Sequence, residues 1–308
     1  MTLQQKDIYG WKGYVWESGD IVVGIVPQLG GRIMSLKFCG EELFFVQPEH
    51  AGETFDLSRL SVDKKEFGFR VWGGDKTWVA PEKMWVDKIP PLDLDAGKYT
   101  LTSPVWGRKL TMSSPICRET GLRIIREVSF KNKYTLVLVE TIKNETKKPI
   151  QRGIWNVAQV VRPFEVYVPC AFNTVRLYPE EAYKHCNPHY YLIDAGNFTG
   201  VSCRDQVHFK FGAYLDKGQM VLIKRYDHAI IGLKKTFSII PNATYAHDAH
   251  VEFYNSPSYP YGEIEIHAPE LILNSGQSFS HMQEWALCAF SPDTALDRIL
   301  ESNAFSQF

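Results

Sequence analysis

Residues 122–143 have the sequence LRIIREVSFKNKYTLVLVETIK, which contains two runs of alternating side chains. In the first run Arg123, Ile125 and Glu127 share one face and the residues between them share the other, a period of two that is typical of a β-strand. The second run covers 135–143 and ends at a polar turn. Two alternating runs with turn residues between them predict neighbouring strands of a meander.

The same alternation recurs along most of the chain. Further strands are expected at 21–26, 32–38, 42–46, 151–161, 208–214, 220–224, 250–254, 263–267 and 285–290. Strands without long helices between them argue against a parallel βαβ sheet. No repeat of roughly 20–50 residues is present to indicate a propeller.

Helical patterns are sparse. The best candidate covers 295–300, with Ser291 or Asp293 as its N-cap, and 178–186 has room for a turn or two. Residues 83–98 are expected to form an ordered surface loop. We therefore predict an all-β sandwich with few short helices, built by residues 1–308 as a single domain.

Composition limits the classes of function. The chain has 308 residues, of which 44% are hydrophobic and 13% aromatic, and 34 basic residues balance 35 acidic ones. With no basic excess, we expect neither a nucleic-acid partner nor attraction to anionic lipid. The pairs Lys147-Lys148 and Lys234-Lys235 are interpreted as solvated turns and strand edges.

Several absences point to a cytoplasmic setting. The first ten residues lack the apolar core of a signal peptide, and no apolar run approaches the roughly 18 residues of a membrane helix. The six cysteines never occur at C-x-x-C spacing, so we interpret them as buried free thiols. No membrane partner is expected.

Residues 67–82, FGFRVWGGDKTWVAPE, form the densest unusual segment. An aromatic face such as that of Trp78 suits the apolar face of a sugar ring, and Arg70, Asp75 and Lys76 suit its hydroxyls. The adjacent glycines lack the spacing of a phosphate loop. The alternative is a strand–loop–strand corner with buried indoles.

A second group of polar residues lies on a predicted hairpin. In strand geometry Asp248, His250, Glu252 and Tyr254 share one face of its first strand, and Glu263, Glu265 and His267 share one face of its second. Antiparallel pairing would bring carboxylates and imidazoles together, which is the composition of a proton-transfer site. The alternative is an exposed polar hairpin face, with Val251, Phe253, Ile264 and Ile266 directed at the core.

A metal site is the other use for these residues. If His247 and His250 belong to a strand they point to opposite faces and chelate poorly, so we expect no metal and no other cofactor. Residues 185–189 are a looser candidate. Trp155 and Asn156 could offer a ring or an amide to a cleft, although not to the same face, and Trp155 in the core is the alternative.

Lys224 is the last candidate. It closes a predicted strand and could place a cation at the mouth of a site, with a surface turn as the alternative.

Taken in order, several stretches resemble the galactose mutarotase-like superfamily, the aldose 1-epimerases and their relatives. The matching stretches are 30–36, 72–82, 153–160, 251–254, 261–269 and 271–279, followed by Trp285. The resemblance implies a two-layer β supersandwich with an open carbohydrate cleft. In mutarotases a glutamate on a late strand takes the anomeric hydroxyl proton and a histidine donates one to the ring oxygen.

By order along the chain, Glu252 is most similar to that glutamate and Arg70 to the family's cleft arginine. The segment that carries the acid histidine differs, because 153–157 take its place.

The expected function is that of a sugar-active enzyme, favoured as a mutarotase-like epimerase, acting at a hemiacetal or an acidic C–H. Glu252 would be the base, assisted by His250 or Glu265. Substrate contacts would come from Arg70, Asp75, Lys76, Trp78, Trp155, Asn156 and Lys224. A carbohydrate-binding protein without turnover and a glycoside hydrolase or lyase are the alternatives. The expected partner is a small sugar or oligosaccharide, and the hypothesis requires 72–82 and the Glu252 strand to line one pocket.

Overall fold

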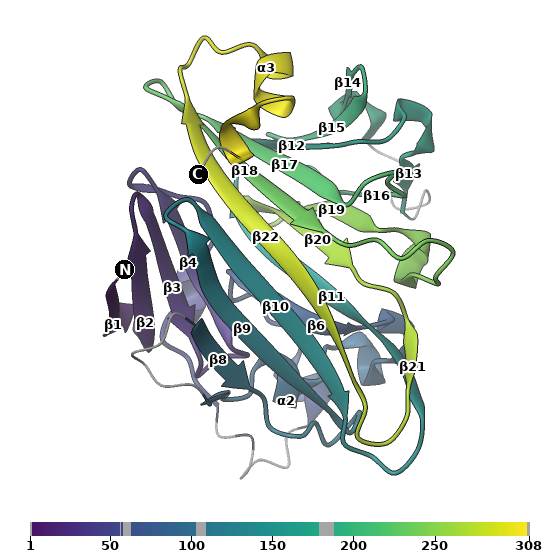
Figure 1. Ribbon diagram of the computed structural model, residues 1–308. Coiled ribbons are helices and arrows are strands. Elements are labelled where there is room, and N and C mark those ends of the chain that lie inside the picture. The colour runs from purple at the N-terminus through teal and green to yellow at the C-terminus, as the bar shows by residue number, and fades with distance from the viewer. Residues whose placement is uncertain (1, 56, 58–62, 103–108, 179–187, 307–308) are drawn as a thin grey trace.

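Two large antiparallel sheets face each other in the computed structural model of this chain (Figure 1). The structure describes residues 2–55, 57, 63–102, 109–178 and 188–306. Every strand pairing in this part of the chain is antiparallel. The all-β prediction is therefore confirmed.

The first sheet has 12 strands in the described chain. Its hydrogen-bonded order is β1 (Thr2–Ile8), β2 (Trp11–Ser18), β3 (Ile21–Val26), β4 (Arg32–Phe38), β6 (Asp75–Ala80), β11 (Ile150–Val161), β20 (Tyr261–His267), β19 (Val251–Asn255), β16 (Phe209–Ala213) and β13 (Arg176–Leu177). Beside this path, β5 (Glu41–Glu42) pairs with β4, and β21 (Leu271–Leu273) pairs with β11.

The second sheet has 10 strands in the same described ranges. Its order is β14 (Leu192–Ala195), β15 (Phe198–Cys203), β12 (Phe164–Val168), β17 (Gln219–Arg225), β18 (Ile230–Phe237), β22 (Ser278–Phe290), β10 (Thr135–Asn144), β9 (Leu122–Asn132), β8 (Lys109–Ser113) and β7 (Thr100–Leu101). The alternating runs at 122–130 and 135–143 are neighbouring strands, β9 and β10, as predicted.

Helices are short. The α-helices are α1 (Lys64–Phe67), α2 (Leu92–Asp95) and α3 (Leu296–Leu300). The 3₁₀ turns are η1 (Pro48–His50), η2 (Glu82–Met84), η3 (Val86–Lys88), η4 (Phe172–Thr174), η6 (Pro188–Tyr191), η7 (Ala246–Asp248) and η8 (Asn303–Ser306). None of the helices in the described ranges is long and apolar enough to cross a membrane.

Three local predictions can be compared with these elements. The helix at 295–300 is confirmed as α3, but its N-cap is Ala295 without a side-chain cap, because Ser291 donates to Asp293 instead of to the helix. The predicted loop at 83–98 contains η3 and α2 and buries Trp85. The turn predicted at 178–186 lies, apart from its first residue, outside the described residues.

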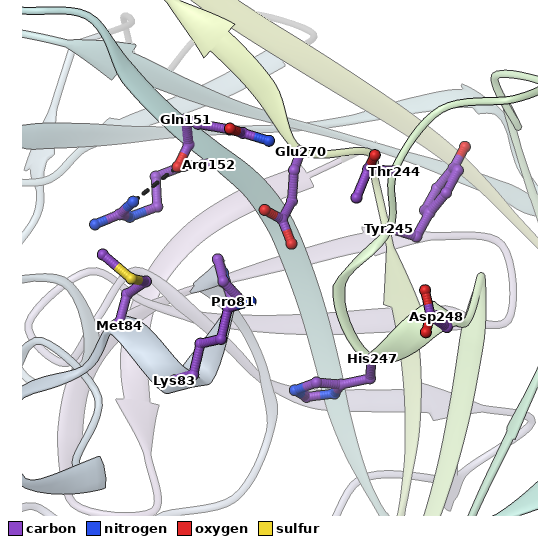
Figure 2. A pocket seen from close by; sticks show the side chains of 10 residues that line it. All are labelled: Pro81, Lys83, Met84, Gln151, Arg152, Thr244, Tyr245, His247, Asp248 and Glu270. Atoms are coloured by element: carbon purple, nitrogen blue, oxygen red, sulfur yellow. Dashed lines mark hydrogen bonds between the residues drawn. The ribbon is translucent and has the colours of Figure 1, made fainter.

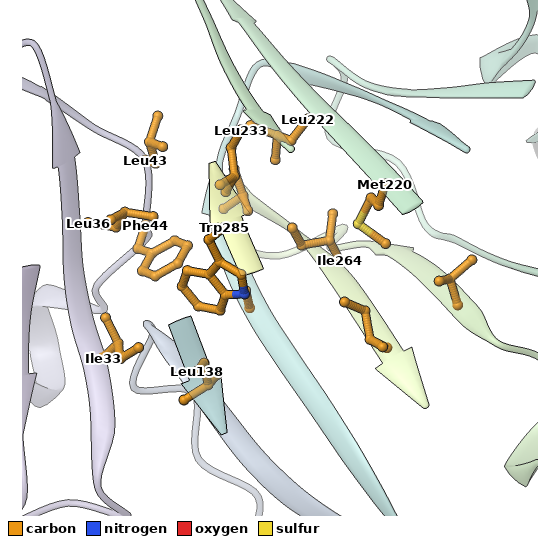
Figure 3. Packing of buried hydrophobic residues seen from close by; sticks show 14 of the residues in the cluster. Ile33, Leu36, Leu43, Phe44, Leu138, Met220, Leu222, Leu233, Ile264 and Trp285 are labelled. Atoms are coloured by element: carbon orange, nitrogen blue, oxygen red, sulfur yellow. The ribbon is translucent and has the colours of Figure 1, made fainter. Parts of the chain in front are cut away.

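An apolar core fills the space between the sheets. Figure 3 shows Trp285 of β22 with Phe44 and Leu138 close to it, and the Phe44 and Trp285 rings meet edge to face at 6.1 Å. The inward residues of β9, such as Ile124 and Val128, are fully buried. Burial of apolar surface on this scale is the main favourable contribution to folding.

A charged group interrupts this core. Arg126 of β9 forms an ion pair with Asp75 of β6, and Lys235 of β18 lies 3.7 Å from the same aspartate. All three are fully buried, so the interpretation of Lys234-Lys235 as a solvated pair is wrong for Lys235. Successive residues of a strand face opposite sides, and Lys235 faces the other sheet.

Candidate functional site

Five neighbouring strands, β6, β11, β20, β19 and β16, direct alternate side chains away from the second sheet. Phe253 and Ile264 belong to the core, as predicted for the inner face of the hairpin. The other face carries Lys76, Trp78, Trp155, Gln159, Lys210, Glu252, Tyr254, Glu263, Glu265 and His267. Most of this polar face is buried, and Lys210 and Tyr254 are half-buried.

Glu252 is the centre of this face. Its Oε2 atom lies 2.8 Å from His267 Nε2, 3.0 Å from His247 Nδ1 and 3.1 Å from Lys210 Nζ. Burial alone would raise the pKa of the Glu252 carboxyl. The charge of Lys210 and the hydrogen bonds from both imidazoles outweigh burial, so this pKa lies well below its usual value. Glu252 is therefore a buried carboxylate that stays ionised.

The pKa of Glu265, which lies directly opposite Glu252 in the ladder, is displaced in the opposite direction. Its Oε2 accepts a hydrogen bond from Trp155 Nε1 at 2.8 Å and lies 3.2 Å from Lys210 Nζ, while its Oε1 is buried without a partner. Burial, together with the charges of Glu252 and Glu263, raises the pKa of Glu265 well above its usual value. Two facing carboxyl groups with pKa values displaced in opposite directions are typical of acid–base sites.

Tryptophans fix the imidazole rings. The His267 ring stacks on Trp155 with centroids 5.1 Å apart, and the His247 ring meets Trp155 edge-on at 5.2 Å. Trp78 and Trp85 pack against Trp155 in turn. Burial lowers the pKa of His267. A neutral His267 that donates from Nε2 leaves Nδ1 without a proton, consistent with the lack of a partner at that atom.

A cavity of about 620 Å³ adjoins this group of residues (Figure 2). Its walls are Pro81, Lys83, Met84, Gln151, Arg152, Thr244, Tyr245, His247, Asp248 and Glu270. His247 belongs both to this wall and to the contacts of Glu252, whereas Glu252 itself is not at the wall. In Figure 2 the Glu270 carboxylate points into the space between Pro81 and Thr244.

The backbone of η7 places His247 at this wall. His247 has φ 56° and ψ 15°, and Asp248 has φ 50°, left-handed values that cost energy for residues other than glycine. Tyr178 donates from its hydroxyl to the His247 carbonyl at 2.6 Å, and Arg176 donates to the Asp248 carbonyl. Strained backbone held by surrounding contacts is frequent at functional sites.

Some residues singled out in the sequence do gather here. Lys76 lies 3.4 Å from Glu263 and 4.3 Å from the centre of the Trp78 ring. Trp78 donates to Asp95 at 2.7 Å and is 5% exposed, so its ring packs in the interior. Segment 72–82 and the Glu252 strand thus lie on one face of the sheet, but only Pro81 of that segment lines the cavity.

Other predicted residues lie elsewhere. Asp75 and Asn156 face the second sheet, where Asn156 donates to Asp75 at 2.9 Å, because they alternate with Lys76 and Trp155 along their strands. Arg70 pairs with Glu53 at 3.1 Å and lies over the Phe55 and Phe67 rings.

Lys224 donates to the Val161 and Pro163 carbonyls at the other end of β11. The predicted face with Asp248 and His250 is also wrong, because β19 begins at Val251. His250 Nδ1 accepts instead from the Leu215 amide at 3.0 Å.

Three neighbours of Glu252 could not be assigned to it from the sequence. His247 was considered only as a metal ligand that would point away from His250 in a strand, His267 was placed on one face with Glu265, and Lys210 was not singled out. Alternation in 208–214 could have placed Lys210 on an outward face, but only the pairing of β16 with β19 brings it to Glu252.

The atoms of His247, Glu252 and His267 could in principle hold a metal ion, since one ligand atom from each lies within 4.8 Å of the others. Two observations disfavour a cation. Lys210 Nζ already lies 3.1 Å from Glu252 Oε2. Nδ1 of His267 lacks the hydrogen-bond acceptor that usually orients a metal-bound histidine. The donor set fits a proton network better than a metal centre.

The same two-sheet architecture occurs in solved structures. A galactose mutarotase-like protein from Lactobacillus casei superposes with a TM-score of 0.58 at 9% identity, over 89% of this chain and 99% of that protein. One from Clostridium acetobutylicum gives 0.57 at 10% identity, over 94% and 99%. A candidate aldose 1-epimerase from Escherichia coli gives 0.55 at 12% identity, over 90% and 98%.

The chain therefore has the fold of galactose mutarotase-like proteins, as the resemblance in the sequence implied. Residues 94–288 match the model of a domain of unknown function, DUF4380, and the chain belongs to that family. No curated protein matches the chain by sequence.

Proposed function

We propose that this protein is a sugar-active enzyme that binds a sugar in the cavity at His247 and exchanges a proton with it through His247 and Glu252. The observation that carries the proposal is the 3.0 Å contact between His247 Nδ1, at the cavity wall, and the buried Glu252 carboxylate. The mutarotase-like fold supports a carbohydrate as ligand.

The chemistry follows from the order of the contacts. A carboxylate that accepts from Nδ1 holds an imidazole in one tautomer and leaves the other ring nitrogen, Nε2, as the group that takes or gives a proton. Glu252 stays ionised because Lys210 and His267 stabilise its charge. Glu252 thus supplies the negative charge that orients the imidazole, and Nε2 of His247 exchanges the proton with the ligand.

The cavity wall suits a polyol. Lys83, Arg152 and Gln151 offer donors, and Asp248 and Glu270 offer acceptors, so hydroxyl groups on several sides of a ring can be bound. A volume of about 620 Å³ is within the usual range of small-molecule sites. The reaction we propose is proton transfer at a hemiacetal hydroxyl or an adjacent acidic C–H, as in an epimerase.

The test compares wild type with Glu252→Gln and His247→Gln on a panel of aldoses and sugar acids. NMR exchange spectroscopy measures anomeric interconversion, and calorimetry measures binding. Loss of the proton-transfer pair should reduce turnover by about 10²–10⁴, with sugar affinity changed much less. Glu301→Gln, at an exposed position after α3, is the matched control and should leave the rate unchanged.

Three outcomes would count against the proposal. If Glu252→Gln keeps the wild-type rate, Glu252 has no part in proton transfer. If wild type binds sugars without accelerating interconversion, the chain is a carbohydrate-binding protein without turnover. New products from oligosaccharides would instead indicate a hydrolase or lyase.

A further inference from the structure

We propose that a second cavity, on the outer face of the ten-stranded sheet, binds a small phosphate-bearing molecule. The cavity has a volume of about 340 Å³. Its walls are Lys131, Asn132, Thr135, Lys217, Gln219, Lys234, Thr236, Glu284, Ala286 and Phe305. It is separate from the His247 cavity and shares no residue with it.

The position of Lys234 shows on which face of the ten-stranded sheet the cavity lies. Lys235 points between the sheets toward Asp75, so Lys234, its neighbour in β18, points outward. Cross-strand pairing brings Thr236 opposite both Gln219 of β17 and Glu284 of β22. The cavity is thus built on adjacent strands of a rigid sheet, with the Phe305 ring of η8 as its apolar wall.

Two largely buried polar side chains line the cavity. Gln219 and Thr135 are each 6% exposed. The Gln219 amide and the Thr135 hydroxyl can both donate hydrogen bonds to the oxygen atoms of a ligand.

The cationic groups of the cavity are only partly compensated. Lys131 is bound by both oxygens of Glu284, at 2.9 and 3.0 Å. Within the described chain no ion pair involves Lys217 or Lys234. Burial, and then the charge of Lys217, lowers the pKa of Lys234. Two ammonium groups without a carboxylate partner, beside these polar side chains, favour an anion.

The size and charge of the cavity define the ligand class. Lysines bind phosphate as compact point charges, and two of them match a phosphate monoester. A long polyanion such as a nucleic acid would need a broad basic surface, whereas the chain as a whole has a net charge of −1. The Phe305 ring, 5.8 Å from Lys234 Nζ, leaves an apolar wall for the rest of the ligand.

Calorimetric titration of the full chain tests this inference. Inorganic phosphate and glycerol 3-phosphate are titrated at constant ionic strength, with chloride and acetate as reference anions. We expect both phosphates to bind and acetate to bind more weakly. Each of Lys217→Gln and Lys234→Gln should weaken binding about tenfold to a hundredfold, the loss of one charge-assisted hydrogen bond. Tighter binding of glycerol 3-phosphate than of phosphate would indicate an organic ligand that uses the Phe305 wall.

The control is Lys147→Gln with Lys148→Gln, which removes two exposed lysines from a turn. This double variant should bind phosphate as wild type does. Absence of phosphate binding to wild type, or equal weakening in the control, would overturn the inference. Because Lys217 and Lys234 are outside the core, unchanged thermal unfolding of their variants should separate loss of binding from loss of folding.

Discussion

Replacing Lys210 with methionine is expected to destabilise the protein in a pH-dependent way. The change keeps most of the length of the side chain and removes its charge. Lys210 Nζ lies 3.1 Å from Glu252 and 3.2 Å from Glu265, whose side chains are each 1% exposed. In Lys210→Met the two facing carboxyl groups would lose the cation between them.

The magnitude follows from the buried pairs. At about 3 Å and an effective dielectric constant near 20, the attraction between Lys210 and the ionised Glu252 is about 5 kcal/mol, of which desolvation offsets a large part. Removing one partner of a buried pair costs about 3–5 kcal/mol, because the other charge remains uncompensated. We therefore expect the free energy of unfolding at about pH 8 to fall by that amount.

The direction of the pH effect can be derived from Glu252. In wild type, Lys210 helps to hold its pKa below the usual value. Without Lys210, burial is opposed only by the two imidazoles, so the pKa of Glu252 should rise and folding of the variant should take up a proton where that pKa exceeds the unfolded value. A group with a raised folded-state pKa loses stability as pH rises through that pKa. The variant should therefore recover part of its lost stability at about pH 5.5.

Urea unfolding of both proteins at about pH 5.5 and pH 8 measures the effect. Lys6→Met is the matched control, since Lys6 pairs with Glu17 at 3.5 Å and both side chains are 47% exposed. An exposed pair contributes about 0–1 kcal/mol. The reasoning is refuted if Lys210→Met costs no more than Lys6→Met, or if its cost stays the same in acid.

Three further outcomes are expected. Burial raises the pKa of Glu140, between the sheets, to about 7. The free energy of unfolding of the wild type should therefore fall as the pH rises from about 5 to 7. Glu140→Gln should flatten this pH dependence in urea titrations, whereas equal slopes in the two proteins would contradict the expectation. Gly73→Ala would place a Cβ 2.1 Å from the Phe45 carbonyl and should lower soluble yield and melting temperature sharply. Gly40→Ala, also at positive φ but with no atom within 4 Å, should cost only about 1–2 kcal/mol, and equal losses would refute the steric argument. Dialysis against a chelator should leave anomeric interconversion unchanged, and a loss restored by added zinc would instead support a metal centre.

Much of the fold was predictable because period-two alternation is a local property. In the runs at 122–130 and 135–143 one face is apolar apart from a single charged residue, Arg126 in the first and Glu140 in the second, so their strands and their pairing follow from the sequence. β6 was harder, because every residue of 75–80 is buried. The sequence could not indicate that Asp75 faces the second sheet while Lys76 faces the Glu252 side.

The site was predictable only in part for a similar reason. Alternation in 263–267 placed Glu265 and His267 together, and the pairing with Glu252 followed from the hairpin. The position of His247 depends on a turn with left-handed backbone at a residue other than glycine, for which the sequence carries no signal. Lys210 reaches Glu252 through pairing of strands 42 residues apart, which local patterns do not encode.

A crystal structure with a bound sugar would test the central claim most directly. Crystals soaked with a mixed sugar library should show a ring in the cavity bounded by Pro81, Arg152 and Glu270. One of its hydroxyls should lie about 2.6–3.2 Å from Nε2 of His247. A ring bound reproducibly at another face of the molecule, with the His247 cavity left empty at saturating sugar, would contradict the proposal.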